Sequence, residues 1–340
     1  MNDSTTTPQT RTRTGTRHGG ALLAMVASLV IAAGCTASAT ASGTAASTAT
    51  ASGSTASGSA PSGAPGGAPG AGGGSASTAL SSTATGAYSQ SGSSAAKTGE
   101  TYTATNADES GVLVSSGGTL TLTTATVITS GNTSSSDNSS FAGLNAGVLA
   151  SGGSTITMTG GTISTTGTGG NGGFASGTGS SLTLKDVTIT ATADGGHGVM
   201  ATQGGSVAVT GGSMTTSGAH GAPLATDRGG GTVVANGGTY VANGTDSPGI
   251  YSTGSITASD ATFTESTSEN IVIEGANSAT ITNSTMTSGS AKWGVMIYQS
   301  MSGDATGSQG TVTMTGGSLT TTNASAPAFY VTNSTGVITL

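Results

Sequence analysis

TITMTGGTIS, residues 155–164, contains the pattern that decides the fold. Two apolar residues flank a threonine, two glycines follow, and a hydroxyl residue then precedes another apolar residue. Close variants return as SVAVTGGSMT (206–215), ATITNSTMTS (279–288) and TVTMTGGSLT (311–320). A phrase that recurs with regular spacing but varied lettering indicates one structural unit used many times.

The second apolar residue of each phrase serves as an anchor for aligning the repeats. Another apolar residue stands two positions before each anchor, and a further one stands five positions after nearly all of them. Successive anchors are 23 to 36 residues apart. The nine anchors are Leu122, Met158, Leu184, Val209, Ala235, Ala258, Ile281, Met314 and Leu340.

A sharp corner is expected two residues after each of the first eight anchors. Glycine, asparagine, aspartate or threonine stands there, and most of these residues tolerate the left-handed backbone that such a corner demands. The corner residues are Thr124, Gly160, Asp186, Gly211, Gly237, Asp260, Asn283 and Gly316. A strand that places alternate residues inward therefore bends there and begins a second strand.

A third apolar strand precedes the anchors, as in GVLV (111–114), GVLA (147–150) and GVMA (198–201). Three strands in about 25 residues describe one coil of a parallel β-helix, in which coils stack about 4.8 Å apart. The sequence predicts an all-β, single-stranded solenoid of about nine coils over residues 99–340. Aliphatic ladders would form its core, which explains why only 3% of residues are aromatic.

The N-terminal part predicts export and anchoring. Arg11, Arg13 and Arg17 precede an apolar run over 21–33, and Cys35 is the only cysteine. Such a run has the length of a signal sequence and is too short to span a bilayer. Gly34-Cys35 resembles a bacterial lipobox, so we expect a lipoprotein signal peptide over 1–34 and a lipid on Cys35 that attaches the exported protein to the membrane.

Residues 35–98 are predicted to be a disordered linker. Alanine, serine, threonine, glycine and proline dominate this stretch, which contains almost no large apolar residue. Such a composition cannot offset the entropy lost on ordering. The whole chain carries a formal net charge of −7, which argues against nucleic acid as a partner.

GVLASGGSTITMTGGTIS (147–164) resembles the repeats of pectin-lyase-like, right-handed parallel β-helix proteins, and its texture is similar to adhesin-like surface proteins and autotransporter passengers. The resemblance covers about 101–340 and implies the fold. It implies little about function, because this fold supports lyases, hydrolases, phage tail proteins and inert stalks.

The third strand places an apolar stripe on its outward side. Its members are Leu113, Leu149, Met200, Tyr251 and Met296. An exposed stripe of this size usually contacts a partner. The alternative is that two long loops, 130–146 and 299–310, fold over it.

Scarce charged and aromatic residues gather at the two ends of that strand. A groove with an apolar floor and polar rims suits a sugar polymer. The predicted ligand-binding residues are Asp227, Arg228, Asp246, Tyr251, Glu269, Glu274, Lys292, Trp293 and Tyr298.

Three functions remain open from the sequence. The first is a surface module for adhesion or binding of an extracellular polysaccharide. The second is a polysaccharide lyase or glycoside hydrolase, and the third is a passive stalk. No cofactor is expected except Ca²⁺ under the lyase alternative, and three histidines at loose spacing do not predict a metal site.

Overall fold

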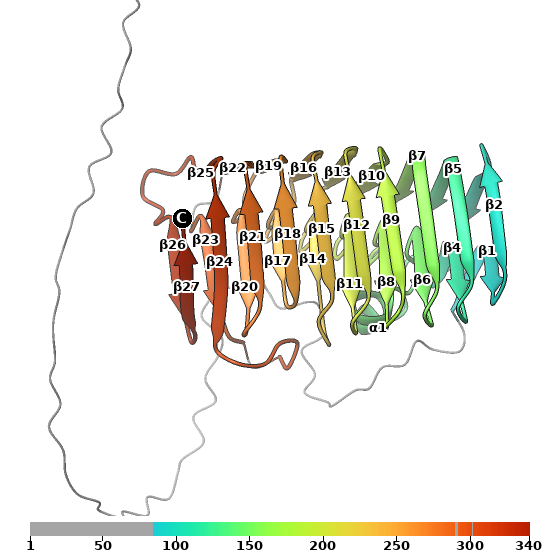
Figure 1. Ribbon diagram of the computed structural model, residues 1–340, viewed down its shortest axis with the longest axis horizontal. Helices are drawn as coiled ribbons and strands as arrows, with labels where there is room; N and C mark the ends of the chain where they lie inside the picture. Colours follow the sequence, from blue (N-terminus) through green and yellow to red (C-terminus); the bar gives the residue numbers. More distant parts are fainter. Residues whose placement is uncertain (1–83, 290–291, 301) are drawn as a thin grey trace, which may run out of the picture. The chain divides into compact units, whose positions relative to one another are not determined.

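The computed structural model describes residues 84–289, 292–300 and 302–340. These residues form an all-β parallel solenoid of about ten turns (Figure 1). Each turn contributes strands to three faces, and each strand pairs in parallel with its equivalent in the next turn. The predicted signal peptide and Cys35 lie outside the described residues.

Face 1 is a ten-stranded parallel sheet. Its strands are β1 (Thr85–Ser91), β4 (Glu109–Ser115), β6 (Val148–Ser151), β8 (Gly173–Ser176), β11 (Val199–Thr202), β14 (Leu224–Thr226), β17 (Ile250–Ser252), β20 (Ile271–Glu274), β23 (Val295–Tyr298) and β26 (Phe329–Thr332).

Faces 2 and 3 join into one 17-stranded sheet, because two long strands turn the corner between them. The long strands are β5 (Thr119–Thr129) and β7 (Thr155–Thr165). Face 2 also contains β2 (Ser94–Thr98), β9 (Ser181–Lys185), β12 (Ser206–Thr210), β15 (Thr232–Asn236), β18 (Ser255–Ser259), β21 (Ser278–Thr282), β24 (Gln309–Thr315) and β27 (Thr335–Thr339). Face 3 also contains β3 (Thr101–Ala104), β10 (Thr188–Ala191), β13 (Ser213–Thr216), β16 (Thr239–Ala242), β19 (Thr262–Glu265), β22 (Thr285–Ser288) and β25 (Ser318–Thr321).

The aliphatic ladders of the core are confirmed. The first eight anchors are all buried, and the register places Met158 over Leu184 and Ile281 over Met314. Leu340, the ninth predicted anchor, is 77% exposed, so its assignment to the core is wrong. It lies beyond the last residue of β27, for which β24 is the only partner strand among the described residues.

The predicted corners between faces 2 and 3 are confirmed at all eight positions. Their φ angles lie between 49° at Asn283 and 68° at Gly237, which is the left-handed region. Thr124 adopts φ 51° although it is β-branched, a conformation that is unfavourable for such a residue. The corner geometry is therefore imposed by the stacking of the turns and not by residue type alone.

The solenoid begins one turn earlier than predicted, since β1 and β2 lie within residues 35–98. This turn escaped the repeat alignment because the register pairs Ala95 with Leu120 and Lys97 with Leu122, so it lacks the apolar pair. Lys97 instead lies 3.4 Å from Glu100 and 5.7 Å from the centre of the Tyr88 ring. These polar and aromatic groups cover the first ladder of the core.

A column of glycines forms the corner between faces 3 and 1. A Cβ on Gly147 or Gly172 would lie 2.4 Å from the Cγ2 atom of Ile163 or Ile189, respectively. Any side chain at these two positions would displace the core ladder. The glycine that opens GVLA and its relatives is therefore a packing requirement.

The ladder geometry predicts a large loss of stability for Ile281→Asp. The substitution buries a carboxylate among aliphatic side chains without a partner, and we expect a cost of about 3–5 kcal/mol. Thr280→Asp is the control, because Thr280 points outward on the same strand and is only partly buried. Thermal unfolding measures both variants, and equal midpoints would contradict the inward assignment of Ile281.

Candidate functional site

The outward stripe of face 1 is buried, so the predicted groove with an exposed apolar floor is wrong. Leu113, Leu149, Met200, Tyr251 and Met296 are at most 8% exposed. In-register neighbours Phe174 and Val272 extend the stripe and are fully buried. The alternative, in which long loops fold over the stripe, is what the structure shows.

The first loop covers the stripe with a short helix, α1 (Ser136–Ala142). Ser135 caps the helix by accepting a hydrogen bond from the Asn138 N–H at 3.2 Å, and Gly143 ends it with φ 79°. A Cβ on Gly143 would lie 2.7 Å from both Leu149 and the Phe174 ring, so the helix end packs directly on the stripe. Serine before and glycine after this segment are helix signals that the sequence already contained.

The second loop, residues 299–310, is held by Glu274. The tyrosine hydroxyls of Tyr251 and Tyr298 donate to Glu274 Oε2 at 2.8 and 2.9 Å. Ser300 and Ser302 donate to the other carboxylate oxygen. Glu274 is fully buried, and burial raises the pKa of both tyrosines well above their usual range, so they remain donors.

Arg228 joins the two loops. Its guanidinium donates to Asp304 Oδ1 at 2.6 Å and lies 4.0 Å from the centre of the Phe141 ring. Phe141 belongs to α1 and Asp304 to the second loop, so one side chain contacts both covers. Asp227, which is 1% exposed, accepts a hydrogen bond from the Arg228 N–H at 2.7 Å, and burial raises its pKa well above the usual range.

Five predicted site residues are thus brought together; four of them are buried, and the side chain of Arg228 is partly exposed. They are Asp227, Arg228, Tyr251, Glu274 and Tyr298. Their polar groups bind one another and the second loop, as described above. The structure gives them a part in fixing the covers of face 1.

The other four predicted residues lie along what we call the corner edge, the line of turns that leads from face 3 into face 1. Lys292 forms an ion pair of 3.6 Å with Asp246, and both side chains are partly exposed. Trp293 stacks on Tyr330 with ring centres 4.2 Å apart. Glu269 is 2% exposed and accepts from Ser268 at 2.7 Å; burial raises its pKa.

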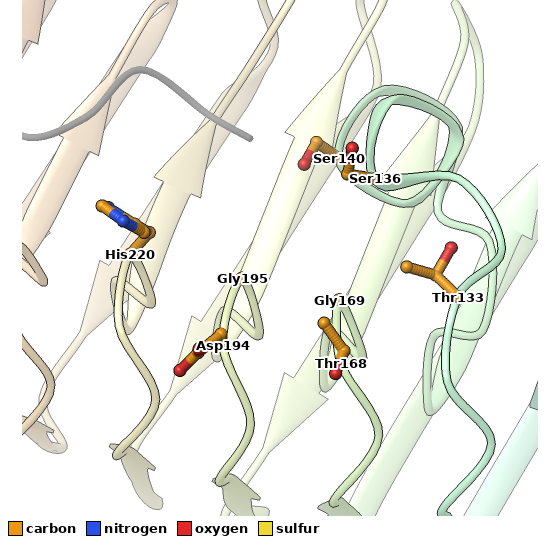
Figure 2. A pocket seen from close by; sticks show the side chains of 8 residues that line it. All are labelled: Thr133, Ser136, Ser140, Thr168, Gly169, Asp194, Gly195 and His220. Carbon is orange, nitrogen blue, oxygen red and sulfur yellow. The ribbon is translucent and has the colours of Figure 1, made fainter. Parts of the chain in front are cut away.

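A pocket of about 230 Å³ lies on the same corner edge, toward the N-terminal turns. Figure 2 shows it between α1 and the turns of three successive coils. Its lining residues are Thr133, Ser136, Ser140, Thr168, Gly169, Asp194, Gly195 and His220. None of these lining residues is among the predicted ligand-binding residues, because one wall comes from α1, a segment that was expected to be a loop.

Hydroxyl, imidazole and carboxylate groups supply the chemistry of this pocket. His220 adopts φ 58°, and its buried Nδ1 atom has no hydrogen-bond partner. Asp194 accepts from the Ala219 N–H at 2.9 Å, which fixes the turn. His197 lies deeper on the previous coil, where its Nδ1 accepts from the Ala222 N–H at 3.0 Å and burial lowers its pKa to about 4.

Glu265 is buried inside the solenoid beneath the corner edge. Its register neighbours are Ala242 and Ser288, and neither carboxylate oxygen has a hydrogen-bond partner. The missing side chain of Gly249 makes room for it, because a Cβ there would lie 2.1 Å from Glu265 Oε1. Burial raises the pKa of Glu265 well above its usual range, so the carboxyl is most stable protonated.

Comparisons with known proteins give no relative: no family model, no curated protein and no solved structure matches the chain. Within the described residues, no group of three or more histidine, cysteine, aspartate or glutamate residues is arranged to hold a metal ion. No helix in that part of the chain is long and apolar enough to cross a membrane.

Glu274→Ala should loosen the second loop. The substitution leaves the hydroxyls of Tyr251 and Tyr298 buried without their acceptor, and we expect a loss of about 3 kcal/mol. Amide hydrogen exchange should rise over 299–310 more than over faces 2 and 3. Glu109→Ala, a partly buried carboxylate on β4 of the same face, serves as the control. Unchanged exchange in the loop would show that Glu274 does not hold it.

Glu265→Gln should reduce the pH dependence of stability. The folded pKa of Glu265 lies above its unfolded pKa, which is about 4.3. The stability that this carboxyl contributes is therefore fully present below the unfolded pKa and is lost as pH rises through the folded pKa. We therefore expect the variant to be more stable than the parent at pH 8 and to differ less from it at pH 4.5. His197 acts in the opposite direction, since its contribution is lost as pH falls from 6.5 toward 4, but it does so equally in both proteins. Parallel profiles of thermal midpoint against pH would contradict the assignment.

Proposed function

We propose that this protein binds a neutral extracellular polysaccharide through the corner edge. The observation that carries the proposal is the pocket beneath α1. Its hydroxyl, imidazole and carboxylate groups can both donate and accept hydrogen bonds, as recognition of sugar hydroxyls requires. Concave sites that combine a few convergent polar groups with apolar walls are the usual places for ligands.

The charge of the corner edge favours a neutral polymer. Asp194 lines the pocket, and Lys292, four coils along the edge, is paired with Asp246. The residues that line the pocket include no lysine or arginine. A polyuronate would bring carboxylates close to Asp194 and Asp246, and this repulsion disfavours it.

The carboxylates in and near the pocket favour binding over catalysis. A glycoside hydrolase needs two carboxyl groups about 5–10 Å apart. Asp194 is the only carboxylate that lines the pocket, while Glu265 and Glu269 are buried behind the edge. Lipidation of Cys35 and export, which the sequence predicts, would place the solenoid at the cell surface, where a polysaccharide ligand is available.

A binding assay with neutral and charged glycans tests the proposal. Soluble β-glucan, mannan and chito-oligosaccharides are the neutral probes, and polygalacturonate is the anionic one. We expect binding of at least one neutral probe, weakened about tenfold in His220→Asn, a loss typical of one buried hydrogen bond. Asparagine tolerates the left-handed backbone at this turn.

Asp260→Asn is the matched control, because Asp260 also occupies a left-handed turn, at φ 53°, but on a different corner. It should bind as the parent does. Absence of binding to every probe would favour the passive stalk. Release of new reducing ends or of unsaturated uronates would favour the enzyme.

A further inference from the structure

We infer that the corner edge receives the end of a polysaccharide chain and not its interior. This inference rests on the proposed function. It follows from the shape of the edge, which is blocked on one side of the pocket and continues on the other. A ligand that enters such a site must present a terminus.

The blocked side is formed by the first loop. Backbone hydrogen bonds stack the turns, from Thr133 to Thr168 at 3.0 Å and from Gly169 to Asp194 at 2.8 Å. The stack of turns continues to Asp108, whose N–H donates to the Asn132 carbonyl at 3.2 Å. After Thr133, however, the chain leaves the edge and passes into α1, whose Ser136 and Ser140 face the pocket (Figure 2). The helix therefore occupies the path that an internal sugar unit would need for its next neighbour.

The wall is fixed by buried hydrogen bonds. Ser139 of α1 donates to the Gly169 carbonyl, and the Asn171 side chain donates to the Ser139 carbonyl at 3.2 Å. The Asn145 side chain donates to the carbonyls of Gly131 and Thr168 at 3.1 and 3.2 Å. Ser139, Asn145 and Asn171 are at most 1% exposed. Moving the helix aside would break the hydrogen bonds of Ser139 and leave buried polar groups unpaired, which is unfavourable.

The other side of the pocket leads along the corner edge. His220 stacks on the next turn through a hydrogen bond from its N–H to the Thr245 carbonyl at 3.0 Å, and Asp246 and Lys292 follow on later coils. Four coil steps separate Asp194 from Lys292, which is about 19 Å at the spacing of β-strands. This length exceeds one sugar ring, so the rest of the polymer would lie along the edge toward Trp293.

The pocket itself is small. A volume of about 230 Å³ lies below the 300–1,000 Å³ of sites for drug-sized ligands, which suits one ring. His220 lines the pocket, and its buried Nδ1 atom has no hydrogen-bond partner. A terminal unit has a hydroxyl where an internal unit has a glycosidic bond, and such a hydroxyl could form hydrogen bonds with the polar groups that line the pocket.

Chain length separates end recognition from interior recognition. Mannan and β-glucan are each prepared at two mean lengths that differ tenfold, so equal masses contain tenfold different numbers of ends. If ends are bound, the mass concentration that half-saturates the wild-type protein should fall about tenfold for the shorter preparation. Equal mass concentrations would overturn the inference while leaving the proposed function intact. Binding to neither polymer, nor to chito-oligosaccharides, would remove the proposed function itself.

A pocket-filling variant provides a second test. Ser136→Trp places a large ring in the pocket from α1 and should weaken binding of the short preparations at least tenfold. Ser255→Trp is the matched control, because Ser255 is exposed on face 2. Both variants are first compared with the parent by thermal midpoint. Full binding by a folded Ser136→Trp protein would overturn the inference, and the length comparison stands if that variant does not fold.

Discussion

In-register stacking of parallel turns is the constraint on which the rest of the structure depends. Every strand pairs with its equivalent one turn away, so each side chain lies directly over a side chain in the same structural role. Stacking residues of the same type on neighbouring turns is then favourable where they are apolar and unfavourable where they are charged. This explains why aliphatic ladders fill the interior and why only 6% of the residues are charged.

The same constraint decides where charge can occur. A buried carboxylate would repel its equals on neighbouring turns, so Glu265 lies between Ala242 and Ser288, which carry no charge. Glu274 is likewise flanked by an uncharged group, Tyr298, which donates a hydrogen bond to it. Buried carboxyl groups survive only with donors around them or with a proton of their own.

Much of the fold was predictable because the repeat contains it. The apolar pair formed by Ile156 and Met158 and the corner at Gly160 have equivalents in turn after turn, so the periodicity of the sequence revealed them. The first turn was missed because Ala95 and Lys97 replace that pair, and contacts among Tyr88, Lys97 and Tyr102 compensate in a way that no periodicity predicts.

The site was only partly predictable for a related reason. Because charged residues are scarce, Asp227, Glu274 and Lys292 could be singled out from the sequence. A charged residue can, however, either hold a loop in place or lie on an exposed edge. What separates the two roles is whether a cover lies above the residue. The covers come from the inserted loops, whose conformations depend on single contacts, such as Arg228 between Phe141 and Asp304, and not on the repeat.

Insertions are also what make one place on the solenoid different from the others. A perfectly repeating surface presents the same groups at every turn and therefore has no unique position for a ligand. The first inserted loop ends this equivalence: α1 covers face 1 on one side and forms the wall of the pocket on the other. Because the turns at Asp194 and His220 are fixed by the ladders below them, that wall meets a surface that is already rigid, and a specific site requires no further scaffold.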